Sequence, residues 1–167
     1  YNAVRFGRPL MDRIFTVTGD AVCEPRNFKI YIGTSFQELL DAASGLVTEC
    51  EKMIAGGPMM GFALFDLNVP TTKTTSALLC LTIDEASLYE QTACINCGRC
   101  VEACPENLIP SKLADFAEHE QKDNYEKWYG LECIECGSCS YGCPAKRPLA
   151  QEIKTMKKQI LADKRKK

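Results

Sequence analysis

The chain has 167 residues, of which 46% are hydrophobic and 25% charged, proportions typical of one ordinary globular domain or two small ones. Its net charge of −2, with no basic patch interleaved with aromatic residues, argues against nucleic-acid binding. No apolar run approaches the roughly 20 residues that span a bilayer. Since the chain begins at Tyr1, without a start methionine or a signal peptide, we expect a piece of a longer soluble or peripheral polypeptide.

The first third of the chain predicts two strands in succession. Residues 14–20 are rich in β-branched and aromatic side chains and end at a Gly-Asp turn. Residues 28–33 alternate cleanly and would place Phe28, Ile30 and Ile32 on one face. One face of this pair should therefore be buried.

A helix should follow, opened by a capping box between Ser35 and Glu38 and stopped near Gly45. Its inward face would carry Phe36, Leu39, Leu40 and Ala43. Residues 52–55 predict a third strand, and residues 77–83 a last strand that leads into the cysteine-rich half. The order strand, strand, helix, strand indicates a β-grasp domain.

The remaining features of this half give no catalytic signature. The Gly-Gly-Pro-Met-Met-Gly stretch at 56–61 fits a tight turn with two core methionines, or a flexible docking surface, but lacks the pattern of a phosphate loop. The isolated cysteines Cys23, Cys50 and Cys80 are expected to be small buried hydrophobes. His119, the only histidine, is expected on the surface. No catalytic residue is predicted.

Eight of the eleven cysteines fall into two copies of the spacing C-x2-C-x2-C-x3-C-P, at 94–105 and 133–144. This is the spacing of two-cluster ferredoxins, in which three cysteines of a run hold one cluster and the fourth reaches the other. One 4Fe–4S cluster is therefore predicted on Cys94, Cys97, Cys100 and Cys143. A second is predicted on Cys104, Cys133, Cys136 and Cys139.

Two other uses of these cysteines fit less well. Structural zinc usually takes two separated C-x2-C pairs, and a disulfide framework would require a secreted context. Gly98 and Gly137 follow the second cysteine of each run, where we expect a side chain to crowd the backbone against a cluster. The sequence thus favours iron–sulfur chemistry over zinc or disulfides.

Residues 105–132, between the two runs, predict helix, which favours a helical ferredoxin module over a small β-rich one. Pro110 and Ser111 would open a first helix, whose apolar face carries Leu113, Phe116 and Ala117. A second, shorter helix would carry Tyr125 and Trp128 and end at Gly130. Trp128 and Tyr129 are expected to pack around the second cluster.

A last amphipathic helix is predicted over 149–161. Its inward residues would be Ile153, Met156, Ile160 and Leu161. Acidic residues outnumber basic ones between Asp84 and Glu135, whereas the chain beyond Pro144 is basic. The basic end could steer an acidic partner or lie near anionic lipid, or it could simply be a solvated helix end whose cations suit the helix dipole.

Several motifs occur together in one known family. They are Val-Thr-Gly-Asp at 17–20, Gly-Thr-Ser at 33–35, the stretch at 56–61, Val-Pro-Thr-Thr-Lys-Thr-Thr at 69–75 and the two cysteine runs. In these the chain resembles the C-terminal part of the C subunit of the Rnf (Rsx) complex. The resemblance implies an α+β protein in three parts: a tail of an upstream flavin/NADH domain at 1–12, an SLBB-like β-grasp domain at 13–84 and a helical 4Fe–4S ferredoxin-like domain at 85–167.

The resemblance also implies a function. The family's complex is membrane-bound and passes electrons between ferredoxin and NAD, coupled to Na⁺ or H⁺ translocation, and its C subunit is peripheral on the cytoplasmic side. FMN and NADH would bind only upstream of this chain, so the chain alone should neither bind nor oxidise NADH. Its two 4Fe–4S clusters would carry single electrons between that flavin and other subunits of the complex, an acidic ferredoxin-like subunit among them.

Two alternatives remain open at this point. The same architecture occurs in NADH-dependent cobalamin reductases and in reductase subunits that feed other enzymes, which would be cytoplasmic. A function of another class is a docking or ligand-binding module whose clusters are only structural. Reversible reduction of the clusters would argue against that last alternative.

Overall fold

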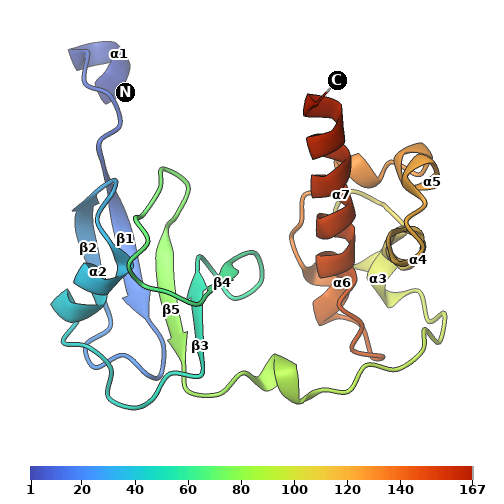
Figure 1. The fold of residues 1–167 in the computed structure, drawn as a ribbon, viewed down its shortest axis with the longest axis horizontal. Coiled ribbons are helices and arrows are strands. Elements are labelled where there is room, and N and C mark those ends of the chain that lie inside the picture. Colours follow the sequence, from blue (N-terminus) through green and yellow to red (C-terminus); the bar gives the residue numbers. More distant parts are fainter. Residues whose placement is uncertain (167) are drawn as a thin grey trace. The chain divides into compact units, whose positions relative to one another are not determined.

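The computed structural model describes residues 1–166 and divides the chain into two compact units, Tyr1–Ala86 and a second that begins at Ser87 (Figure 1). The first is built around a sheet and the second from helices, so the chain is an α+β protein as predicted. A short 3-10 helix, η1 (Glu85–Leu88), lies at the division. Within the described residues no helix is both long enough and apolar enough to cross a membrane.

The first unit contains one five-stranded mixed sheet. Its strands are β1 (Asp12–Thr18), β2 (Arg26–Tyr31), β3 (Lys52–Ala55), β4 (Phe62–Leu64) and β5 (Ala77–Leu81). They lie in the order β2-β1-β5-β3-β4, with β1 and β5 parallel and the other neighbours antiparallel. Two hairpins thus flank a central last strand, and this β-grasp arrangement confirms the predicted fold. The predicted strands 14–20 and 28–33 form two residues earlier than expected.

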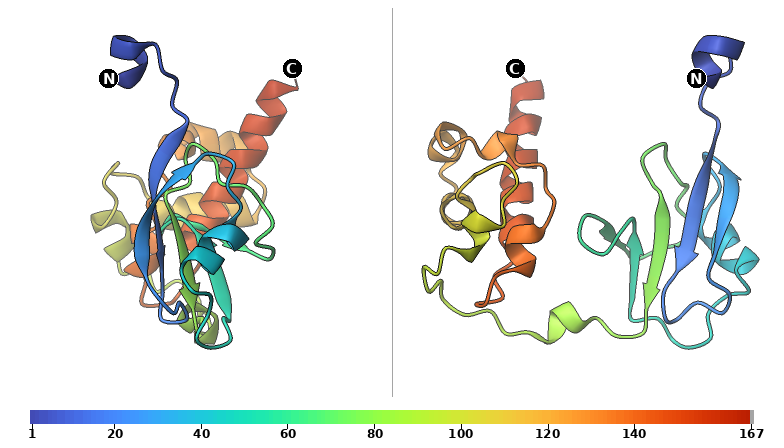
Figure 2. Two further views of the ribbon diagram at one scale, coloured as in Figure 1. Left: turned by 90° about the vertical axis from the view of Figure 1, so that its left-hand side faces the viewer. Right: turned by 180° about the vertical axis from the view of Figure 1, so that it is seen from behind.

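Helix α2 (Phe36–Ala42) covers one face of this sheet (Figure 2). Its capping box is formed as predicted: the Ser35 hydroxyl accepts from the Glu38 N–H, and the Glu38 carboxylate accepts from the Ser35 N–H, both at 3.2 Å. The core lies between helix and sheet. Its buried members include Phe15, Val17, Phe36, Leu39, Leu40, Ala43, Leu78 and Cys80.

Several features of the first unit differ from expectation. Helix α1 (Asn2–Phe6) and strand β4 were not predicted; α1 has no buried residue, and β4 has three residues of which two are exposed. The stretch at 56–61 does form a tight turn, but Met59 and Met60 are exposed, so they are not core residues. Cys23 is also exposed, whereas Cys80 is buried and Cys50 half-buried.

In the described part of the second unit, all elements of regular secondary structure are helices. Its helices are α3 (Arg99–Glu102), α4 (Pro110–Glu118), α5 (Lys122–Lys127), the 3-10 helix η2 (Gly130–Glu132), α6 (Ser138–Tyr141) and α7 (Leu149–Arg165). The helices predicted between the cysteine runs are therefore present, and the last helix extends beyond the predicted 149–161. Helices α4 and α7 pack against each other (Figures 1 and 2).

Tyr125 lies at the centre of this unit, fully buried among Leu113, Leu149, Ile153 and Met156. Two aromatic predictions were wrong in part. Tyr129 is 70% exposed, and Trp128 packs edge-on against Phe116, with ring centroids 5.8 Å apart, rather than lining a cysteine cavity. Leu161 is 38% exposed and does not join the core, because the preceding residue of α7, Ile160, takes the inward position at that turn.

Candidate metal centres

The two cysteine runs have the same local structure. In each, the first two cysteines lie in a loop and the third lies in a short helix, α3 or α6. The fourth follows that helix and precedes a proline. Between the first and second cysteines stands a residue with positive φ, Asn96 at 54° in one run and Glu135 at 59° in the other. Such left-handed steps curl the backbone so that successive N–H groups face one concave side, which suits a bound anionic group.

Gly98 and Gly137 occupy equivalent places just before the short helices, with φ of 79° and 81°. A side chain is strained in this conformation. A Cβ on Gly98 would meet no protein atom within 4 Å, so the backbone conformation, rather than crowding by the protein, accounts for glycine here. The crowding against a cluster that the sequence suggested stays a prediction.

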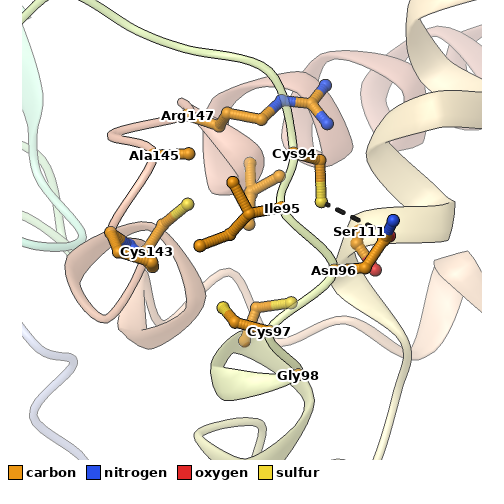
Figure 3. A pocket seen from close by; sticks show the side chains of 12 residues that line it. Cys94, Ile95, Asn96, Cys97, Gly98, Ser111, Cys143, Ala145 and Arg147 are labelled. Carbon is orange, nitrogen blue, oxygen red and sulfur yellow. Dashed lines mark hydrogen bonds between the residues drawn. The ribbon is translucent and has the colours of Figure 1, made fainter.

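The first cavity gathers cysteines from both runs. It is lined by the thiols of Cys94, Cys97, Cys100 and Cys143. Figure 3 looks into this cavity: the cysteines reach it from separate segments of the chain, and Arg147 lies at its edge. Ser111, at the start of α4, completes one wall. Three thiols of one run thus face the same space as the fourth thiol of the other.

The second cavity is built in the same way with the runs exchanged. It is lined by the thiols of Cys104, Cys133, Cys136 and Cys139. Its walls come from the apolar side chains Leu108, Leu113 and Ile153 and from the acidic residues Glu106 and Glu135. The eight cysteines of the two runs therefore gather in the two groups of four that their spacing suggested.

The thiols of the second cavity differ in acidity. Burial raises the pKa of Cys139 to about 11 and also raises that of Cys133. A hydrogen bond between Cys136 and Ser138, at 3.5 Å, lowers the pKa of Cys136. Buried thiols of high pKa are inert unless a metal ion displaces their protons. Burial therefore makes Cys133 and Cys139 poor nucleophiles, whereas Cys136 is more acidic than an ordinary thiol.

Arg147 is the charged residue that distinguishes the first cavity, and its side chain is only 13% exposed. It forms an ion pair with Glu118 of α4 and lies 3.8 Å from Glu152 of α7. Although burial opposes its charge, the hydrogen bond to Glu118 and the two carboxylates raise the pKa of the guanidinium. Burial and the neighbouring Glu118 raise the pKa of Glu152 to about 7.

Two lysines of α7 lie near the second cavity. Lys154 is 3.6 Å from the carboxylate of Glu135, and Lys157 donates to the main-chain carbonyl of Cys133 at 2.6 Å. Neither lysine lines the cavity itself. The cavity surface therefore presents two carboxylates, of which Glu135 is paired with Lys154.

Sequence reasoning missed Arg147 as part of a site, although a signal was present. When the two cysteine runs are superposed in register, Arg147 falls at the position of the cavity-lining Leu108. The remaining singled-out residues lie elsewhere. His119 is exposed, with Nδ1 2.8 Å from the Asp115 carbonyl, and Cys23, Cys50 and Cys80 belong to the first unit.

Comparison with known protein families agrees with this architecture. A model described as an SLBB domain matches residues 14–63, and a model described as a 4Fe-4S dicluster domain matches residues 93–147. The first unit thus contains an SLBB domain, and the second is an iron–sulfur domain of the ferredoxin-like kind.

Similar proteins point to one family. The chain is 44% identical, over 96% of its length, to the C subunit of the Na(+)-translocating ferredoxin:NAD(+) oxidoreductase complex of Acetobacterium woodii. It is 45% identical, over 93% of its length, to the C subunit of the proton-translocating complex of Clostridium ljungdahlii, and 40% identical over 98% to that of the ion-translocating oxidoreductase complex of Methanosarcina acetivorans. These matches span 36%, 34% and 36% of the respective relatives, about a third of their length. The chain is therefore a homologue of a part of the C subunits of ion-translocating oxidoreductase complexes, and it carries an SLBB domain followed by a 4Fe–4S dicluster domain.

Proposed function

We propose that the second unit holds two 4Fe–4S clusters, one in each cysteine cavity. The ligands of the first would be Cys94, Cys97, Cys100 and Cys143. The ligands of the second would be Cys104, Cys133, Cys136 and Cys139. The observation that carries the proposal is the exchange of the fourth cysteine between runs, which gives each cavity four thiol donors. Four soft donors around a concave backbone fit a cubane.

When bound, such clusters supply one-electron chemistry. The chain's own residues hold and insulate them: α4 and α7 wall both cavities, and the apolar side chains around the second cavity exclude water. In each run, about one turn of backbone separates the third cysteine, which lines one cavity, from the fourth, which lines the other. The arrangement favours passage of single electrons over conversion of a substrate.

We further propose that this electron relay serves an Rnf-type complex that couples electron transfer between ferredoxin and NAD to ion translocation. The names of the relatives support this assignment. Since the chain spans about a third of those relatives, FMN and NADH would bind to a region outside it. Its partners would be other subunits of the complex, and its place would be peripheral, on the cytoplasmic side of the membrane.

The basic C-terminal end of α7 could bind an acidic ferredoxin-like subunit. Part of the basic end is already paired within the second unit: Lys164 contacts Glu126 at 2.6 Å. Arg165 and Lys166 are exposed, and Lys167 lies outside the described residues. Docking would therefore depend on Arg165 and Lys166 more than on Lys164. Replacing both Arg165 and Lys166 by glutamine should lower the rate of electron transfer to that subunit at low salt. The rate should be unchanged at high salt, where charges are screened.

Reconstitution tests the cluster proposal directly. The protein should be loaded anaerobically with iron and sulfide, its iron counted, and its EPR spectrum followed during a redox titration. About eight irons and two reducible centres are expected from two 4Fe–4S clusters. One zinc ion per cavity and no reducible centre would instead assign the cavities a structural role and contradict the relay.

A further inference from the structure

The internal repeat of the second unit makes its two cavities comparable position by position. Cys94 corresponds to Cys133, and in the same register the cavity-lining Arg147 corresponds to the cavity-lining Leu108. Asn96, in the loop of the first cavity, corresponds to Glu135 in the second. At two equivalent positions, therefore, the first cavity carries a side chain more positive than its counterpart.

We infer that the cluster in the Cys94 cavity has the higher reduction potential of the two, and that Arg147 is the residue chiefly responsible. This inference rests on the proposed function, since it requires both cavities to hold clusters. A cluster that accepts an electron becomes more negative, so a nearby cation stabilises its reduced form and a nearby carboxylate destabilises it. The cation in the first lining therefore raises the reduction potential of its cluster, and the carboxylates in the second lining lower that of the other.

Partial burial makes the charge of Arg147 effective. A charge in a region of low dielectric is screened less than one in water, and the Arg147 side chain is only 13% exposed. Its two carboxylate partners, Glu118 and Glu152, do not line the cavity, whereas Arg147 does. Of these three charged side chains, only the Arg147 guanidinium therefore lines the cavity.

The charges that line the second cavity favour a lower reduction potential. Glu106 and Glu135 line this cavity, whereas Lys154 and Lys157, whose charges could compensate, do not. Lys154 is paired with Glu135, and Lys157 donates to a main-chain carbonyl. Main-chain N–H groups of Leu108 and Glu135 approach cysteine sulfurs at 3.4 Å, which favours reduction, but these are neutral dipoles and weigh less than a full charge.

Solvent exposure acts in the same direction. Cys94 and Cys97 are exposed, whereas Cys133 and Cys136 are half-buried. Water solvates the more negative reduced state, so a more exposed cluster is easier to reduce. The charge of the lining and the exposure of the cysteines are independent observations. Both favour a higher reduction potential, and therefore earlier reduction, for the cluster in the Cys94 cavity.

The test is a redox titration of the full chain, reconstituted to full iron content, with the two reduction steps followed by EPR. Arg147→Leu copies the repeat-equivalent Leu108. It should move the upper step down toward the lower one and leave the lower step near its original value. Arg147→Lys, which keeps the positive charge, should give a much smaller shift and serves as the matched control.

A second variant keeps the test decisive if Arg147→Leu does not assemble. Glu135→Gln removes an anion from the lining of the second cavity and should move the lower step up. Glu132→Gln changes an exposed carboxylate nearby that does not line a cavity, and should move neither step. An unchanged pair of steps in Arg147→Leu, or a shift of the upper step in Glu135→Gln, would overturn the inference. Failure of the proposed function appears separately, as an iron count well below eight in the unmodified protein.

Discussion

The hydroxyl of Tyr125 lies 2.9 Å from the main-chain carbonyl oxygen of Ile153, and this contact joins the segment between the cysteine runs to helix α7. The same hydroxyl lies 3.0 Å from the carbonyl of Gly130, just before the second run. Burial raises the pKa of Tyr125, so its hydroxyl keeps its proton and remains a donor. One fully buried side chain therefore connects three segments of the iron–sulfur unit.

Tyr125→Phe should destabilise the protein by about 1 kcal/mol, because it removes a buried hydrogen bond while leaving the ring in place. The midpoint of urea unfolding, followed by the helix signal in circular dichroism on anaerobically reconstituted protein, measures this. Tyr129→Phe is the control, since Tyr129 is 70% exposed. Equal losses in the two variants would contradict a special role for the Tyr125 hydroxyl.

Gly130→Ala should destabilise the same unit by steric overlap. A Cβ at this position would lie 2.3 Å from the Tyr125 ring, which is fully buried. Overpacking of this kind typically costs about 1–3 kcal/mol. Gly57→Ala, where a Cβ would meet nothing within 4 Å, should leave the unfolding midpoint within experimental error of the unmodified protein. Relief of the Gly130→Ala defect by a smaller residue at 125 would identify the clash as its cause.

Glu152 should make stability fall as the pH rises. Its pKa in the folded protein is raised from 4.5 to about 7, chiefly by burial and then by Glu118. The folded state therefore holds a proton that the unfolded state has released between about pH 4.5 and 7. The stabilisation is complete below pH 4.5 and is lost as the pH rises through 7. Thermal midpoints at pH 5, 6, 7 and 8 should decline less in Glu152→Gln than in the unmodified protein; parallel declines would refute the assignment.

The variant Cys143→Ser tests whether the fourth cysteine of a run binds the cluster of the other run or that of its own run. If Cys143 serves the first cavity, its loss should remove or convert the cluster held by Cys94, Cys97 and Cys100, although Cys143 belongs to the other run. The iron count should fall, and the upper reduction step should be the one affected. Cys23→Ser, which changes an exposed cysteine of the first unit, should retain all iron. Loss of the step that Glu135→Gln shifts, which belongs to the second cavity, would mean that each run holds its own cluster.

Features governed by neighbouring residues could be predicted from the sequence. The capping box at Ser35 depends on residues three apart, and the strand at Lys52–Ala55 on a short apolar run. Both are present as predicted, as are the helices between the cysteine runs. The grouping of eight thiols into two cavities also followed from spacing, because about one turn of helix separates the third cysteine from the fourth.

Features governed by tertiary packing could not be predicted. Tyr125 and Tyr129 are the same residue type four positions apart, yet one is fully buried and the other 70% exposed, because the missing side chain of Gly130 makes room for the first ring. Ile160 and Leu161 are both apolar, but the packing of α7 buries only the first. Likewise, the central place of β5 depends on long-range pairing with β1, which its own sequence does not encode.

The exchange of the fourth cysteine also has a consequence for biosynthesis. Translation adds residues from the N-terminus, so the thiols of the second cavity are all present once Cys139 has been made. The first cavity still lacks Cys143 at that moment, although its other three thiols were made earlier. The cavity whose first three cysteines are translated first is therefore completed last, and a chain released before Cys143 could complete only the second cavity.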